Sequence, residues 1–157
     1  MKRFKLGARL AIALAFALMA LQFNQVTAQP ASPADPIAAR KAVMKEHGRD
    51  FYGTATRMSR GQIPFDAAAA SAAFSRLANN DVFLASFPEG SQTGDTRAAP
   101  AIWSNRAQFE MLARKLTTDA NAAAENSKRG EEAFKESFRT VAATCDACHR
   151  EFRLPAR

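Results

Sequence analysis

Cysteine and histidine are scarce in this sequence, with two residues of each among 157. A structural zinc site normally takes four such ligands, whereas Cys145, Cys148 and His149 offer three and His47 lies far upstream. Glycine and β-branched residues are also few after residue 28, and no strand-rich stretch accompanies the cysteines. A thioredoxin-like dithiol normally lies beside a βαβ unit. A zinc protein or a thiol protein is therefore the weakest interpretation of this chain.

The two cysteines are spaced as Cys145-Asp146-Ala147-Cys148, and His149 follows directly. This C-x-x-C-H pattern is the attachment signature of a c-type haem. Each thiol can form a thioether with one vinyl group of the same porphyrin, while the adjacent imidazole reaches the iron from one face. A disulfide within one helical turn is geometrically unfavourable. The pattern predicts one covalently bound haem c, with His149 as an axial ligand.

Residues 1–28 have the pattern of a secretory signal peptide. Basic residues precede an apolar stretch from Leu10 to Leu21, and Val26-Thr27-Ala28 offers a small-residue cleavage site. The apolar stretch is short for a membrane span, although a retained N-terminal anchor stays open as an alternative. Export agrees with the haem motif, because haem is attached to reduced thiols outside the bacterial cytoplasm. We therefore expect cleavage near Ala28 and a periplasmic location.

Most of the net positive charge lies in this leader segment. The whole chain has a formal net charge of +7, and residues 1–28 carry four basic and no acidic residues, so the remainder has +3. The high isoelectric point is thus largely a property of the leader. It gives no reason to expect a nucleic-acid partner.

Residues 29–157 are enough for one domain, and their composition favours helices. Apolar side chains recur at spacings of three and four, which predicts four amphipathic helices. The expected helices run from the cap Asp35 to Arg60, from the cap Asp66 to just before Pro88, from Pro100 to about Ala124, and from near Ser127 to Leu154. The expected fold class is all-α, an antiparallel four-helix bundle.

The last predicted helix carries the haem motif on its apolar side. Its inward stripe comprises Phe134, Phe138, Val141, Cys145, Cys148 and Phe152. These residues follow one another at spacings of four and three, which is typical of a helix that packs in a bundle. The haem is therefore expected inside the bundle near the C-terminal helix.

In this pattern the chain resembles the class II c-type cytochromes, the group of cytochrome c′ and the low-spin cytochrome c-556. The residues that carry the resemblance are Arg40-x-x-x-Met44-Lys45 with Gly48-Arg49, the turn Gly61-Gln62-Ile63-Pro64-Phe65-Asp66, Pro100-x-Ile102-Trp103, and Cys145-x-x-Cys148-His149-x-x-Phe152-Arg153. The resemblance implies a four-helix bundle, a periplasmic location and frequently a homodimer. Such a dimer would use the outer faces of the first two helices, where Phe51 and Tyr52 are large side chains that could be exposed.

The resemblance places Met44 at the sixth coordination position of the iron, opposite His149. A methionine thioether there gives a low-spin iron suited to electron transfer with periplasmic redox proteins, and the protein would then not be an enzyme. The alternative is that Met44 only fills the core. The iron would then be five-coordinate, as in a cytochrome c′ that binds nitric oxide or carbon monoxide. His47 can also ligate iron, but the family pattern gives it no such role.

Two arginines match family positions near the haem. Arg40 matches an arginine that lies near a haem propionate, and Arg153 matches one that covers the proximal face and influences the electrostatics around His149. Lys41 and the loop from Asp95 to Arg97 could also approach the propionates. The competing interpretation of both arginines is a solvated side chain.

Overall fold

The computed structural model describes residues 35–79 and 81–156, and the predicted signal peptide lies outside these residues. The helices are α2 (Pro36–Gly48), η2 (Arg49–Ala55), α3 (Thr56–Ser59), α4 (Ala67–Leu77), α5 (Asp81–Ala85), α6 (Ala101–Ser104), α7 (Arg106–Ser127) and α8 (Glu131–Phe152). Within the described ranges, pairing of extended backbone is limited to one isolated bridge between Ala98 and Arg153. None of these helices is long and apolar enough to cross a membrane.

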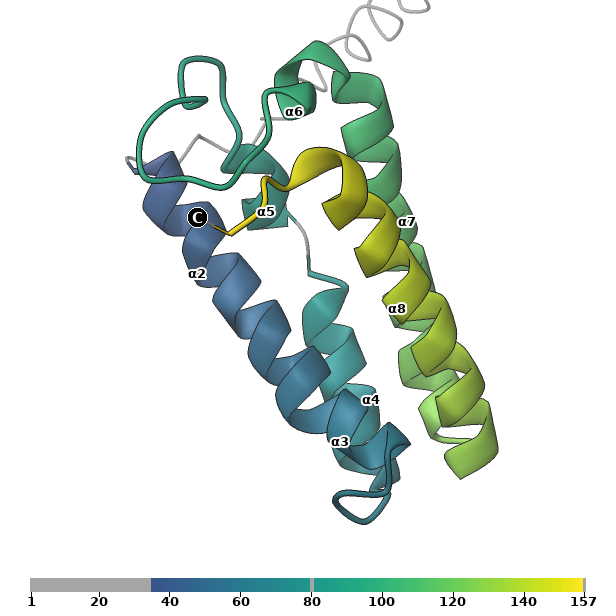
Figure 1. The fold of residues 1–157 in the computed structure, drawn as a ribbon. Coiled ribbons are helices and arrows are strands. Elements are labelled where there is room, and N and C mark those ends of the chain that lie inside the picture. The colour runs from purple at the N-terminus through teal and green to yellow at the C-terminus, as the bar shows by residue number, and fades with distance from the viewer. Residues whose placement is uncertain (1–34, 80, 157) are drawn as a thin grey trace, which may run out of the picture.

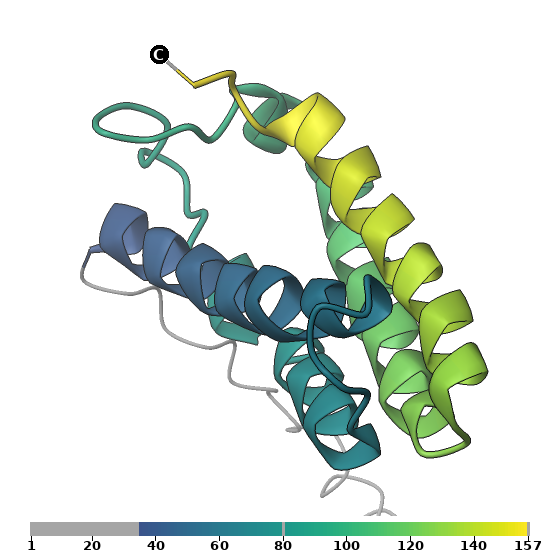
Figure 2. The same cartoon turned by 60° about the horizontal axis from the view of Figure 1, so that its bottom comes forward.

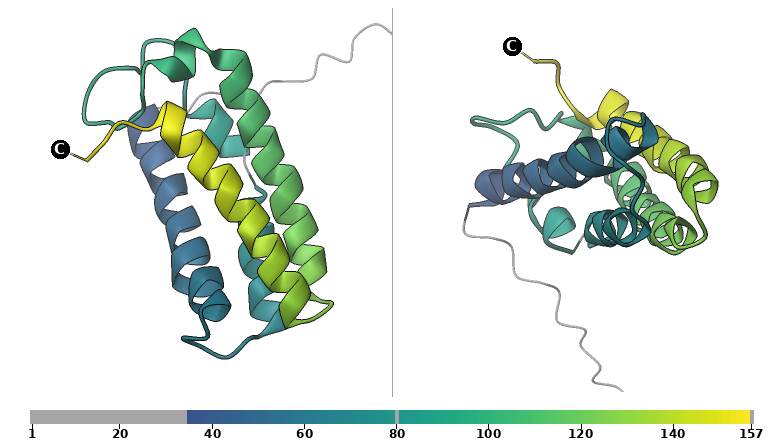
Figure 3. Two further views of the ribbon diagram at one scale, coloured as in Figure 1. Left: turned by 45° about the vertical axis from the view of Figure 1, so that its right-hand side comes forward. Right: turned by 90° about the horizontal axis from the view of Figure 1, so that it is seen from below.

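The helices form the predicted antiparallel bundle (Figures 1 and 3). Helices α2, η2 and α3 follow one another as a single long rod, which turns back into α4. Helices α7 and α8 form a second hairpin, with α7 packed between α4 and α8. The fold class expected from the sequence is therefore confirmed.

The helix ends follow from capping residues and glycines. Asp35 and Asp66 each accept a hydrogen bond at Oδ1, from Ala38 N and Ala69 N respectively, and both bonds are 2.9 Å long. These carboxylates satisfy N–H groups that lack a partner inside the helix. Gly130 has φ of 117°, a conformation that favours glycine, and it lies directly before α8.

Three of the four predicted helices differ in the structure from their expected ranges. The second predicted helix is split into α4 and α5, and the sequence between them contains Asn79-Asn80. Asparagine side chains form hydrogen bonds with the nearby backbone in non-helical conformations, so they disfavour a helix interior. The third is interrupted at Asn105, whose φ and ψ of −125° and 51° are not helical. The fourth starts at Glu131 instead of near Ser127, because Ser127 is buried within the last turn of α7 and donates to Ala123 O.

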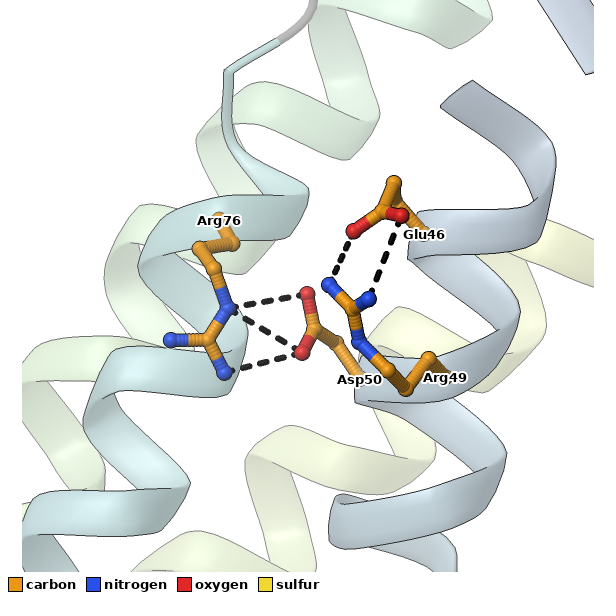
Figure 4. A network of polar contacts seen from close by, with 4 residues as sticks. All are labelled: Glu46, Arg49, Asp50 and Arg76. Carbon is orange, nitrogen blue, oxygen red and sulfur yellow. Dashed lines mark hydrogen bonds and ion pairs between the residues drawn. The ribbon is translucent and has the colours of Figure 1, made fainter. Parts of the chain in front are cut away.

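Helix η2 is a π-helix in the middle of the first rod, where the Thr56 N–H bonds to Phe51 O, five residues earlier. In this segment the buried carboxylate of Asp50 lies against α4. Figure 4 shows Arg76 of α4 donating to both oxygens of Asp50, at 2.8 to 3.0 Å, next to an exposed pair of Glu46 and Arg49. The Asp50–Arg76 contact fixes the rod to α4 by a charge-assisted bond.

The core has two apolar clusters, one toward each end of the bundle. We call the first the Phe134 cluster, and its larger buried members are Phe51, Met58, Phe74, Leu77, Phe134 and Val141. We call the second the Phe109 cluster, and its larger buried members are Phe83, Phe87, Ile102, Phe109, Leu112 and Phe152. Helix α8 contributes to both clusters, so it connects the two ends of the core.

Replacing Phe134 with Ala tests the first cluster. Phe134 is fully buried, and its ring lies 5.3 Å from Phe65 and 5.9 Å from Phe74 between centroids. The cavity left by this substitution should lower the free energy of unfolding by about 3–5 kcal/mol, measured by urea denaturation of the purified protein. The control Val82→Ala, at a side chain that is 55% exposed, should change it by less than about 0.5 kcal/mol. Equal losses in the two variants would contradict the assigned core.

Candidate haem site

A cavity of about 470 Å³ lies between α2 and α8 and is lined by both helices. Its volume is within the range of about 300–1,000 Å³ that is usual for ligand and cofactor sites. Met44 lines it from α2, and Cys145, Cys148 and His149 line it from α8. The structure therefore brings together, in one cavity, the residues that the sequence analysis assigned to the iron and to the thioethers.

The remaining walls are predominantly apolar and come from helices on every side. Large apolar residues in the lining are Phe51, Leu77, Phe83, Phe87, Ile102, Phe109, Leu112, Leu116 and Phe152. The sequence analysis did not place Phe83 and Phe87 at the site, although their spacing of four just before Pro88 is a signal of a shared helical face. Such walls suit a porphyrin, whose large faces are apolar.

Cys145 and Cys148 are free, half-buried thiols on α8. Cys145 packs against the Phe134 cluster and Cys148 against the Phe109 cluster, so a group bonded to both would lie where the clusters meet. Burial, with smaller contributions from neighbouring acidic groups, raises the pKa of each thiol to about 11. Both thiols are therefore protonated at neutral pH, which is consistent with addition of an S–H group across a vinyl double bond.

His149 lies in the last turn of α8 and is half-buried. Burial is the main cause that lowers its pKa below the ordinary value, and the positive charge of Arg153 lowers it further. A lower pKa favours the neutral imidazole, which is the form that binds iron. The donor set on α8 thus fits a covalently held haem.

Arg153 is exposed and lies just beyond the helix. Helix α8 ends at Phe152, and Arg153 has the extended angles φ −124° and ψ 122°. The last helix, which the sequence predicted to run to Leu154, therefore ends two residues earlier, and Arg153 lies outside it. Arg153 still lines the cavity, and its proposed proximal role stays a prediction.

Met44 and His47 both line the cavity from α2. Met44 is half-buried and packs against the Phe109 cluster. His47 is also half-buried, and its ring lies 6.4 Å from that of Phe83 between centroids. Burial lowers the pKa of His47, and the negative charge of Asp50 partly opposes this effect. Helix α2 therefore presents a thioether and an imidazole to the same cavity.

Arg40 is only 3% exposed, so the interpretation of this residue as a solvated arginine is wrong. Its guanidinium donates five hydrogen bonds: Nε and Nη2 to Thr96 Oγ1 at 3.2 and 2.9 Å, Nη1 to Ser86 O at 3.2 Å and Ser91 Oγ at 3.1 Å, and Nη2 to Ser91 O at 2.8 Å. These acceptors are all neutral. A contact between Arg40 and a haem propionate stays a prediction, and it would require one of these N–H groups to change partner.

Other cations lie in the lining near Arg40. Lys41 forms an exposed ion pair with Asp95 at 2.5 Å, and Arg97 donates to the carbonyl of Leu154. Both Lys41 and Arg97 line the cavity, and their approach to the propionates stays a prediction.

The two aromatic residues proposed for a dimer surface differ in exposure. Phe51 is buried and stacks on Phe138 with ring centroids 4.9 Å apart, so the expectation that it is exposed is wrong. Tyr52 is 61% exposed. Only Tyr52 of this pair remains available to a partner.

An all-helical bundle with a C-x-x-C-H motif along an apolar cavity defines a haem c protein. Comparison with known families agrees, because residues 35–153 match the family described as Cytochrome C'. The chain belongs to this family, whose cofactor is one covalently attached haem c.

Individual relatives carry two different names. The chain is 37% identical to cytochrome c-556 of Agrobacterium fabrum over 136 residues, which cover 86% of this chain and 92% of the relative. It is 36% identical to cytochrome c' of Rhodopseudomonas palustris over 121 residues, covering 76% and 82%. The solved structure of cytochrome c' from Rhodopseudomonas palustris superposes with a TM-score of 0.74 at 34% identity, covering 80% of this chain and all of that one.

Substitution of the cysteines tests the attachment site. We expect Cys148→Ser to leave one thioether and one unreacted vinyl group, which shifts the ferrous pyridine haemochrome spectrum to longer wavelength. The double variant Cys145→Ser/Cys148→Ser should lose all haem on denaturation and acid–acetone extraction. Thr144→Val, next to Cys145 but without a thiol, serves as the control and should retain both thioethers. Haem that stays with the denatured double variant would contradict the assignment.

Proposed function

We propose that the protein is a periplasmic electron carrier in which His149 and Met44 bind the haem iron from opposite faces. The observation that carries this proposal is that Met44, from α2, lines the same cavity as the His149 imidazole and the two thiols of α8. The bound haem supplies the redox chemistry, because its iron alternates between the ferric and ferrous states. The carrier transforms no substrate, and its partners would be other periplasmic redox proteins.

The side chains of the cavity have distinct tasks in this proposal. Cys145 and Cys148 anchor the porphyrin, and the lowered pKa of His149 keeps its imidazole available to the iron. Met44 would supply a thioether as the second protein ligand of the iron, and such a ligand would favour a high reduction potential. The apolar walls exclude water, which also influences the potential.

The alternative function is a five-coordinate protein that binds nitric oxide or carbon monoxide. Two observations favour it. Met44 packs against the Phe109 cluster, as a core methionine without any iron bond also would. In addition, a variant of cytochrome c prime from Alcaligenes xylosoxidans, 27% identical with a TM-score of 0.68, was solved as a nitric oxide complex. In this alternative, Met44 shields the iron without bonding to it.

Replacing Met44 with Ala tests the ligand directly. If the thioether binds the iron, the ferric protein should change from low-spin to high-spin at neutral pH, and the ferrous protein should begin to bind carbon monoxide. Absorption and electron paramagnetic resonance spectra measure both changes. Met58→Ala is the matched control, because Met58 is buried in the Phe134 cluster and does not line the cavity. It should lower stability by about 2–5 kcal/mol without changing the spin state.

The gas-binding alternative gives the opposite result in this experiment. The unmodified protein would already be high-spin and would already bind nitric oxide, and Met44→Ala would leave the spin state unchanged. That outcome would overturn the carrier assignment.

A further inference from the structure

The two proposed iron ligands lie on α2 and α8, and a long loop contacts both helices at one end of the bundle. We call residues 86–99 the bridging loop. Figure 2 shows it between the N-terminal end of α2 and the C-terminal end of α8, and Figure 3 shows the same arrangement from other directions. Thr96, Arg97 and Ala98 of this loop line the cavity together with both helices. The bridging loop is therefore in contact with both walls that carry the proposed ligands.

On the α2 side, Arg40 is the principal contact of the bridging loop. All five of its N–H groups donate hydrogen bonds to oxygen atoms of Ser86, Ser91 and Thr96. The guanidinium carbon also lies 5.2 Å from the ring centroid of Phe87 and 5.8 Å from that of Trp103, within the range of cation–π contacts. An arginine has five N–H donors in total, so the hydrogen-bonding capacity of this side chain is fully used by the loop.

A second close approach joins the bridging loop to α2. Gly94 has φ of 117°, and a Cβ atom at this position would lie 3.0 Å from Ile37 Cδ1. A side chain at position 94 would therefore need both a strained backbone and a shift of its neighbour. The bridging loop is thus held against α2 by polar contacts at Arg40 and by packing at Gly94.

On the α8 side, the bridging loop is held by backbone hydrogen bonds. Ala99 N donates to Phe152 O at 3.0 Å, and Leu154 N donates to Arg97 O at 2.8 Å. The Arg97 side chain donates to Leu154 O through Nε at 3.0 Å and Nη2 at 2.8 Å. These contacts begin three residues after His149.

We propose that Arg40 is a positioning residue that, through the bridging loop, sets the distance of Met44 from the iron bound by His149. Met44 is one helical turn after Arg40, so any movement of α2 at Arg40 also moves the thioether. Ligand sites require geometry held within about 0.5 Å, and the loop joins the two helices close to both ligands. The inference rests on the proposed function, because it assumes that Met44 binds the iron.

The test compares Arg40→Gln, Arg40→Lys and Thr96→Val in the haem-loaded protein. The readouts are the high-spin fraction of the ferric protein and the intensity of the methionine-to-iron charge-transfer band. Arg40→Gln should raise the high-spin fraction about tenfold, as expected when one or more buried hydrogen bonds are lost. Thr96→Val, which leaves Arg40 in place but removes one acceptor, should act in the same direction. Arg40→Lys should give an intermediate value.

Asp50→Asn is the control for a loss of stability without any change at the bridging loop. It weakens the contact between the Asp50 carboxylate and Arg76, but Asp50 neither touches the bridging loop nor lines the cavity. It should lower the melting temperature without changing the spin state. A change of spin state in Asp50→Asn as large as in Arg40→Gln would overturn the positioning role.

The remaining outcomes separate this inference from the proposed function. An unchanged spectrum of Arg40→Gln, beside an altered spectrum of Met44→Ala, would overturn the inference alone. An unchanged spectrum of Met44→Ala would overturn the proposed function and the inference with it. If Arg40→Gln alters the pH dependence of the midpoint potential while Thr96→Val has no effect on the spin state, Arg40 acts on a propionate, and the positioning role is overturned.

Discussion

The C-terminal half of α8 presents two thiols and an imidazole to one side of an apolar cavity, and the rest of the fold depends on this arrangement. Cys145 and Cys148 each pack against a different apolar cluster, so the motif lies where the two parts of the core meet. A covalent cofactor bonded to both cysteines would become part of the core itself. Burial also sets the chemistry of the site, because it is the main cause of the raised thiol pKa values and of the lowered pKa of His149.

The other helices keep the cavity open and bring a second wall to it. The Phe134 cluster holds the first rod against α4, α7 and α8 at the end away from the bridging loop, and the Asp50–Arg76 contact joins the middle of the rod to α4. At the other end, contacts between α2 and the bridging loop, and between that loop and the residues after α8, connect the two walls. Because the contacts that hold the helices together lie on both sides of the cavity, one bundle can combine a stable core with a cavity for a flat cofactor.

The sequence alone predicted the parts of the site that depend on local spacing. The motif Cys145-x-x-Cys148-His149 and the caps Asp35 and Asp66 act over a few residues, so their roles can be inferred without coordinates. The partners of Arg40 lie about fifty residues away along the chain, in a loop without periodicity, and only the fold brings them together. The burial of Phe51 follows from the packing of the π-helical segment on α8, a local geometry that apolar spacing did not reveal.

The central claim is that the thioether of Met44 completes the coordination of an iron bound by His149. Near-infrared magnetic circular dichroism of the unmodified ferric protein at neutral pH tests it most directly, since the energy of the low-spin charge-transfer band identifies the axial ligand pair. We expect the band that is typical of histidine–methionine ligation. A high-spin spectrum without that band, or a band at the energy typical of two histidines, would contradict the account.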